Sequence, residues 1–130
     1  MLVNTAVWIE LLSGKPQRAI REQELLGFVT CGPIVQEVLQ ELRPGPLSDS
    51  FREAFLSIPV LSDPTPLRLF ISAAAIYQHG RRKGFTIRSS VDCLIAAIAI
   101  ENSVPVWHRD RDFGAIARYT RLEVAQPRQA

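Results

Sequence analysis

The sequence predicts an α/β protein with a central parallel sheet and helices on both faces. Short apolar runs such as Leu2–Val3 and Val106–Trp107 alternate with longer segments whose apolar residues recur at helical spacing. Glycine and proline separate many of these segments, and this alternation is typical of parallel strands joined by helices. The sequence contains no internal repeat, low-complexity stretch or linker, so we expect residues 1–130 to form a single domain.

The first half of the chain is predicted to contain two strands and three helical segments. Strand Leu2–Val3 ends at Asn4, and Thr5 is suited to cap a helix over residues 6–12. A more polar helical segment is expected over residues 17–25, followed by a strand over residues 28–30. Pro33 suits the first turn of the next helix, which extends through residue 42.

The second half begins after the Pro-Gly-Pro turn at residues 44–46, the strongest signal in the chain for a break in secondary structure. A helix over residues 47–57 and a strand at Val60–Leu61 are expected, and Thr65 is expected to cap a helix that extends through residue 83. Later elements are a helix from Ser89 or Ser90, strand Val106–Trp107, a helix over residues 115–119 and a strand over residues 122–124. The apolar positions of the helix ending at residue 83 include Leu67, Phe70, Ile71, Ala74 and Tyr77.

Composition narrows the class of protein. Hydrophobic residues make up 47% of the 130 residues and the formal net charge is +2, which is typical of a globular domain and permits, without requiring, a polyanionic partner. Cys31 and Cys93 lie in apolar segments and are expected to be buried, reduced thiols. No apolar run is long enough to span a membrane, and the first residues do not resemble a signal peptide, so we expect a cytoplasmic protein.

Acidic residues gather in the segment 89–113. Asp92 lies in the first turn of a predicted helix, where the helix dipole favours a negative charge, and Asp110 and Asp112 follow a buried strand. Ligands of open α/β sheets bind beyond the carboxyl ends of the strands, so these carboxylates are expected to converge there. Glu37, on a helix after another strand, is a further candidate. Oxygen ligands of this kind suit Mg²⁺ or Mn²⁺, although capping and solvation explain many single acids equally well.

The remaining polar and aromatic residues allow two interpretations. Neither His108 nor His79 is expected to have a catalytic role. Basic residues form either a phosphate-binding rim or a solvated edge, and large aromatic residues form either the core or an interface with a partner. The basic residues are Arg81, Arg82, Lys83, Arg88, Arg109 and Arg111, and the aromatic residues are Trp8, Phe51, Phe55 and Phe70.

Four segments resemble one known family along essentially the whole chain. They are residues 2–8 (Leu-Val-Asn-Thr-Ala-Val-Trp), 35–40 (Val-Gln-Glu-Val-Leu-Gln), 88–96 (Arg-Ser-Ser-Val-Asp-Cys-Leu-Ile-Ala) and 108–113 (His-Arg-Asp-Arg-Asp-Phe). In this order and spacing they resemble the PIN-domain ribonuclease toxins of the VapC type. The resemblance implies a PIN-like three-layer α/β fold, an acidic pocket for Mg²⁺ or Mn²⁺, an RNA substrate, a cognate antitoxin partner and a homodimer.

The resemblance also implies roles for individual residues. Glu37, Asp92, Asp110 and Asp112 correspond to the family's catalytic acids, with Ser90 as a hydroxyl that orients substrate or water. Cleavage would leave a 5′-phosphate and a 3′-hydroxyl. Asp92, Asp110, Asp112 and the residue at position 4 are the expected metal ligands, and either Asp110 or Asp112 could make the direct contact in the last motif.

Position 4 departs from the family pattern. The first strand of the family ends in aspartate, whereas this chain has Asn4, which retains an amide oxygen but loses a negative charge. We therefore expect an impaired enzyme. The asparagine is either natural or an engineered replacement for aspartate. The alternative function is a non-catalytic RNA- or protein-binding PIN domain. A phosphoacceptor receiver domain is disfavoured because the chain lacks that fold's early acid pair and late lysine.

Overall fold

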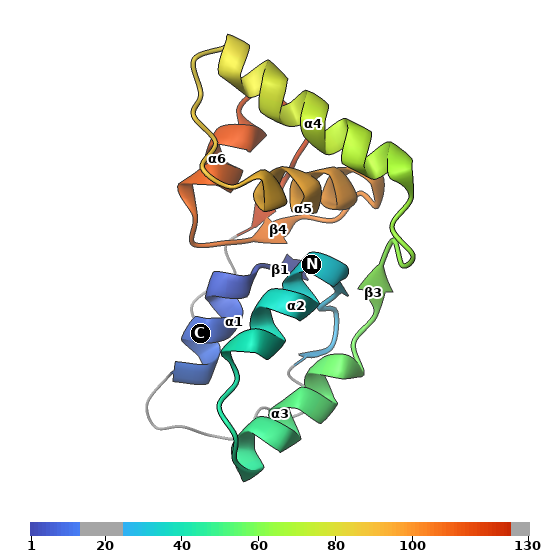
Figure 1. Ribbon diagram of the computed structural model, residues 1–130, viewed down its shortest axis with the longest axis vertical. Helices are drawn as coiled ribbons and strands as arrows, with labels where there is room; N and C mark the ends of the chain where they lie inside the picture. The colour runs from blue at the N-terminus through green and yellow to red at the C-terminus, as the bar shows by residue number, and fades with distance from the viewer. Residues whose placement is uncertain (14–24, 126–130) are drawn as a thin grey trace.

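The computed structural model describes residues 1–13 and 25–125 of the chain (Figure 1). Within these residues, each strand from β1 (Leu2–Val3) to β5 (Val124–Ala125) is separated from the next by one or two helices. The helical segment predicted over residues 17–25 lies, apart from Leu25, outside the described residues. No helix in the described part of the chain is long and apolar enough to cross a membrane.

All strand pairings are parallel, as predicted. Strand β1 pairs with β4 (Val106–Trp107), which pairs with β5, and a separate pair joins β2 (Thr30–Cys31) to β3 (Val60–Leu61). A single bridge between Leu2 and Val29 connects the two groups, giving the order β3-β2-β1-β4-β5. Residues 28 and 29 therefore precede the strand that was expected to contain them.

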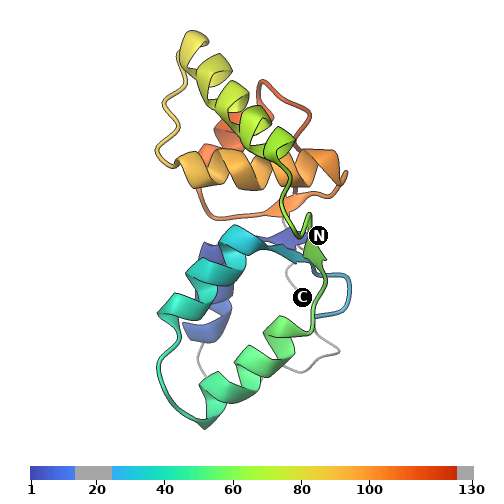
Figure 2. The same cartoon turned by 45° about the vertical axis from the view of Figure 1, so that its right-hand side comes forward.

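Helices cover both faces of this sheet (Figures 1 and 2). On one face lie α1 (Thr5–Ser13), α2 (Gly32–Glu41) and α3 (Pro46–Leu56), and on the other lie α4 (Leu67–Arg82), α5 (Ser90–Glu101) and α6 (Arg111–Ala117). Leu2, Val3 and Val106 are fully buried, as expected for parallel strands covered on both sides. The predicted three-layer α/β fold is confirmed.

The core on the α1–α3 side is built around Trp8. Its ring makes edge contacts with the rings of Phe28, Phe51 and Phe55, with centroids 5.9, 5.9 and 5.1 Å apart. Trp8, Phe51 and Phe55 are buried, so their interpretation as core residues is confirmed, whereas Phe70 on α4 is 49% exposed.

Helix α4 buries a different face from the one that its apolar pattern suggested. Leu69, Ala73 and Gly80 are its buried residues, and the buried set does not include the large apolar positions that predicted the helix. Those positions face solvent because the side of α4 that carries Leu69, Ala73 and Gly80 packs against α5 and Tyr119. The exposed residues are Leu67, Phe70, Ile71, Ala74 and Tyr77.

Several helix starts also differ from expectation. Thr5 is the first residue of α1 and not its cap, because the Asn4 carbonyl accepts the Val7 N–H at 3.1 Å. The Thr65 hydroxyl donates to the Ser62 carbonyl at 2.8 Å, so it does not cap α4. Helix α6 begins at Arg111, four residues before the predicted start, because the Asp110 side chain caps it.

Candidate metal centre

Three of the predicted acids come together at the carboxyl end of the sheet. One carboxylate oxygen from each of Asp92, Asp110 and Asp112 lies within 4.8 Å of the other two. Asp92 comes from the first turn of α5, Asp110 from the loop after β4, and Asp112 from the first turn of α6. Asp92 and Asp112 are 7% and 3% exposed, whereas Asp110 is half-buried. The cluster is therefore open to a ligand mainly on the Asp110 side.

Backbone amides hold two of these carboxylates in place. The Asp112 Oδ1 and Oδ2 atoms accept the N–H groups of Arg88 at 3.1 Å and Ser89 at 3.0 Å. The Asp110 Oδ1 atom accepts the Asp112 N–H at 3.0 Å, which makes Asp110 the cap of α6. Because this cap starts α6 at Arg111, Asp112 lies in the first turn of the helix.

Asp92 is the least satisfied of the three carboxyl groups. Its Oδ2 atom is buried and has no hydrogen-bond partner. Burial, with hydrogen bonding to Asp112 and the negative charge of Asp110 acting in the same direction, raises the pKa of Asp92 to about 8. A carboxyl group in this setting must bind either a proton or a cation. Three hard oxygen donors around an unpartnered oxygen fit Mg²⁺ or Mn²⁺.

Asn4 lies beside this cluster, at the end of the neighbouring strand. Its backbone N–H donates to the Trp107 carbonyl at 3.0 Å, so β1 ends next to the end of β4, whose following loop carries Asp110. Asn4 is only 5% exposed. A carboxylate at this position would therefore add its charge to the same end of the sheet.

Glu37 is not a member of the three-acid cluster. It lies on α2, on the opposite face of the sheet from α5, and its Oε1 atom accepts the Thr5 hydroxyl at 3.0 Å. Because Thr5 follows Asn4 directly, this bond brings Glu37 to the same sheet edge. Sequence reasoning missed Thr5 as a partner, since nothing in the local pattern links residues 32 positions apart.

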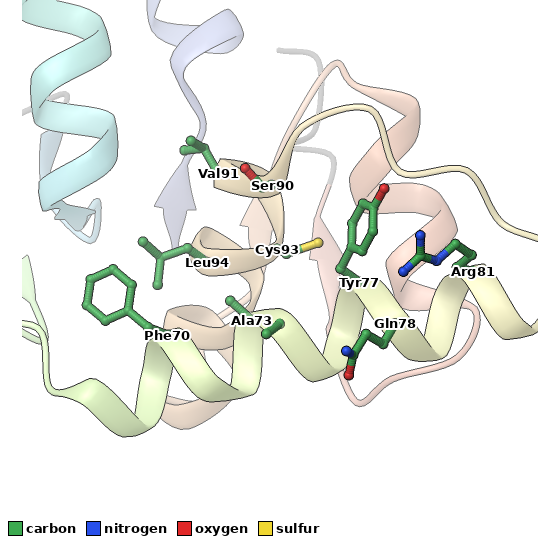
Figure 3. Close-up of a pocket in the computed structure, with 10 residues that line it drawn as sticks. Phe70, Ala73, Tyr77, Gln78, Arg81, Ser90, Val91, Cys93 and Leu94 are labelled. Carbon is green, nitrogen blue, oxygen red and sulfur yellow. The ribbon is translucent and has the colours of Figure 1, made fainter.

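Ser90 is exposed at the start of α5 and lines a groove between α4 and α5 (Figure 3). The groove has a volume of about 510 Å³. Most of its lining is apolar, and Ser90, two residues before Asp92, is one of its polar lining residues. Its lining residues are Phe70, Ala73, Ala74, Tyr77, Gln78, Arg81, Ser90, Val91, Cys93 and Leu94.

Two of the basic residues considered as a phosphate-binding rim or a solvated edge already contact other side chains. The Arg109 Nε atom donates to Glu10 at 3.0 Å, and the Arg109 guanidinium lies 5.9 Å from the centre of the Trp107 ring. The Arg81 guanidinium lies 5.2 Å from the centre of the Tyr77 ring. Both groups remain exposed and retain donors that could meet a phosphate.

The cysteines behave as expected. Cys31 and Cys93 are buried and free, and burial raises their thiol pKa values to about 12 and about 11. Cys93 follows Asp92 directly, and the negative charges of Asp92 and Asp112 add to the effect. Neither thiol is therefore a nucleophile at neutral pH.

Fold and site together define an α/β protein with a candidate carboxylate metal centre at the carboxyl end of a parallel sheet. The family model of the PIN domain matches residues 1–119. The chain belongs to the PIN domain family, and within that family it is similar to the VapC ribonucleases, which confirms the resemblance seen in its motifs.

Two relatives illustrate this similarity. VapC ribonuclease Mb1587 of Mycobacterium bovis and Ribonuclease VapC11 of Mycobacterium tuberculosis are each 33% identical over 131 residues, covering 96% of this chain and 97% of the relative. The solved structure of FitAB bound to the IR36 DNA fragment superposes with a TM-score of 0.63 at 20% identity, covering 95% of this chain and 92% of that chain. FitAcB from Neisseria gonorrhoeae superposes with a TM-score of 0.62 at 17% identity, covering 97% of both chains. These solved structures support the fold.

Proposed function

We propose that this protein is the toxin of a type II toxin–antitoxin system and a Mg²⁺- or Mn²⁺-dependent endoribonuclease. The observation that carries the proposal is the convergence of Asp92, Asp110 and Asp112, with one buried oxygen unpartnered, in a chain so similar to VapC ribonucleases. A bound divalent cation supplies positive charge that lowers the pKa of a nearby water and neutralises charge on the scissile phosphate.

The residues of the site would have different roles in binding the cation, the attacking water and the RNA. Asp92 and Asp110 would hold the cation, with residue 4 beside them. Asp112 would complete the acidic set, but both of its oxygens already accept backbone N–H groups, so its larger contribution would be to hold the site together. Glu37 would orient the attacking water, and Ser90 would contact the RNA at the open rim. In-line attack would leave a 5′-phosphate and a 3′-hydroxyl.

Asn4 would weaken this enzyme. The amide supplies one neutral oxygen where a carboxylate would supply negative charge, and hard cations prefer the carboxylate. Disturbing even a residue that only orients a metal ligand typically costs about 10–100-fold in affinity or activity. We therefore expect at least this loss relative to a chain with aspartate at position 4.

The test compares the full chain with its Asn4→Asp form on structured and single-stranded RNA, with and without Mg²⁺ or Mn²⁺. The expected result is metal-dependent cleavage by Asn4→Asp, at least tenfold faster than by the unsubstituted chain. Asn102→Asp, at the far end of α5, controls for the added charge. If Asn4→Asp cleaves no RNA under any of these conditions, the nuclease assignment is wrong.

A second candidate function is a non-catalytic RNA- or protein-binding PIN domain. Only Asn4 favours it, because a binding module needs no complete set of metal ligands. Mn²⁺ titration of both chains discriminates between the two functions. Tight binding that strengthens on Asn4→Asp supports the nuclease, whereas RNA binding without a divalent site supports the binding module.

The partners follow from the same proposal. We propose RNA as substrate, a cognate antitoxin as the inhibiting partner, the cytoplasm as the location, and a homodimer as the assembly. The exposed side of α4, with Leu67, Phe70 and Ile71 at 72%, 49% and 63% exposure, would receive the second copy along the groove in Figure 3. A patch of large apolar side chains on one helix is typical of such an interface.

A further inference from the structure

His108 has no role in the proposed reaction, yet it contacts the backbone of the metal centre. Its Nδ1 atom accepts the Asp110 N–H at 3.2 Å. Its ring packs against Phe113, with ring centroids 5.5 Å apart and planes inclined by 45°. Because Nδ1 is the acceptor, the neutral ring carries its proton on Nε2. One ring nitrogen is therefore committed to holding the loop after β4.

This hydrogen bond is the first of a series that runs through two of the acids and ends at the helix that carries the third. His108 accepts the N–H of Asp110, and Asp110 accepts the N–H of Asp112; each bond spans two residues, as in an Asx turn. Asp112 in turn accepts the N–H of Ser89, which precedes α5. Since Asp92 lies in the first turn of α5, the series begins at His108 and ends at the start of the helix that presents Asp92.

The Asp110 N–H has no partner within α6, because Asp110 precedes the first residue of that helix. The backbone of Asp110 is extended, with φ −118° and ψ 136°, and its side chain is held by the hydrogen bond that Oδ1 accepts from the Asp112 N–H. The His108 acceptor and the Phe113 contact therefore restrain the residue whose carboxylate forms the open side of the cluster.

We propose that His108 is a positioning residue: its Nδ1 atom holds Asp110 in the orientation that binds the cation. This inference rests on the proposed function, because it requires Asp110 to be a metal ligand. Groups that orient a metal ligand typically contribute about 10–100-fold to metal affinity. The effect of losing the acceptor is expected in this range.

Two substitutions separate the acceptor from the ring. His108→Asn keeps an oxygen that can accept the N–H two residues ahead but removes the ring. His108→Phe keeps an aromatic ring against Phe113 but removes the acceptor. The measurement is Mn²⁺ affinity by calorimetry, in the full chain as it stands and in its Asn4→Asp form. We expect His108→Phe to weaken Mn²⁺ binding by about 10–100-fold and His108→Asn to remain within a few-fold of its parent. His79→Phe, at an exposed histidine on α4, is the matched control and should bind as the parent does.

The possible results are distinct. If a parent binds Mn²⁺ and His108→Phe binds it equally well, or if the Asn and Phe variants are equally weakened, the role of His108 is overturned and the metal centre stands. If neither parent binds Mn²⁺, the metal centre is wrong and this proposal fails with it. Should His108→Phe not fold, ¹⁵N shifts of the unsubstituted chain decide: a proton on Nε2 agrees with the proposal, and a neutral ring protonated on Nδ1 contradicts it.

Discussion

Ser89 and Asp112 are joined by a hydrogen bond in which the Ser89 N–H donates to Asp112 Oδ2 at 3.0 Å. The other oxygen of Asp112 accepts the Arg88 N–H at 3.1 Å. The Ser89 side chain makes no capping bond to α5, so the carboxylate of a distant helix organises the approach to α5 instead. Asp112 thereby couples the two helices that present the acids of the site.

Replacing Asp112 should cost stability as well as activity. Asp112→Ala leaves two part-buried N–H groups without their acceptor. A fully buried group would cost about 1–3 kcal/mol, so we expect less than this for each, partly offset by relief of repulsion from Asp92 and Asp110. Asp112→Asn keeps one acceptor oxygen and should cost less. Urea unfolding of the metal-free protein measures the free energy of unfolding of both variants. Asp110→Ala, at a half-buried aspartate, serves for comparison. Equal stability of Asp112→Ala and the unsubstituted chain would show that these bonds contribute nothing.

The stability of the metal-free protein should depend on the protonation of Asp92. Burial, Asp112 and Asp110 raise the pKa of this carboxyl group from 3.8 to about 8 in the folded protein. Between these values the folded chain retains a proton that the unfolded chain has released, so the free energy of unfolding contributed by Asp92 falls as pH rises. Asp92→Asn, which cannot ionise, should flatten the profile and should be relatively more stable than its parent above pH 8.

Urea unfolding in EDTA between about pH 6 and about pH 9 tests this dependence. Added Mn²⁺ should reverse it, because the cation competes with the proton and binds better as the carboxyl group ionises. If the stability of the parent depends on pH in the same way as that of Asp92→Asn, the assigned protonation is contradicted.

The bond from Thr5 to Glu37 should matter for catalysis more than for folding. Thr5→Val keeps the shape of the side chain but removes the hydroxyl that donates to Glu37 at 3.0 Å. In the Asn4→Asp form we expect cleavage to slow by about tenfold or more, the usual effect of losing an orienting contact, while Thr5→Ser retains the rate. Thr65→Val, which loses a similar hydroxyl bond to Ser62 in a loop, is the control. If Thr5→Val leaves kcat unchanged, the orientation of Glu37 by Thr5 does not contribute to catalysis.

The exposed face of α4 should determine the oligomeric state. Ile71→Glu places a charge on a residue that is 63% exposed on this face, and we expect it to convert a dimer to a monomer. Leu26→Glu adds the same charge at a residue that is 79% exposed outside that helix and should leave the dimer intact. Sedimentation equilibrium of the full chain distinguishes these outcomes. An unsubstituted chain that stays monomeric at micromolar concentration rules out this interface.

The spacing of apolar residues predicted the helices and strands of the described chain better than it predicted which side of each helix is buried. The alternation of apolar runs and helices was sufficient for the parallel sheet, because strand and helix periods are local properties. The buried side of α4 was not predictable in this way. A Cβ atom at Gly80 would collide with the Tyr119 hydroxyl, which donates to the Ile76 carbonyl at 2.9 Å, so the contact with Tyr119 favours burial of this glycine. No count of apolar residues within α4 contains that information.

The sequence by itself determined the α/β class, the acidic residues at the ends of its elements and the departure at Asn4, since these depend on residue type and local spacing. Only the tertiary structure decided which acids meet. It gathered Asp92, Asp110 and Asp112 because Asp110 caps the helix that carries Asp112, and the Asp112 carboxylate accepts the N–H groups before α5. It left Glu37 outside that cluster, where its carboxylate accepts the Thr5 hydroxyl. Such pairings join residues distant in the chain, so they follow from strand order and long-range hydrogen bonds, which local patterns do not encode.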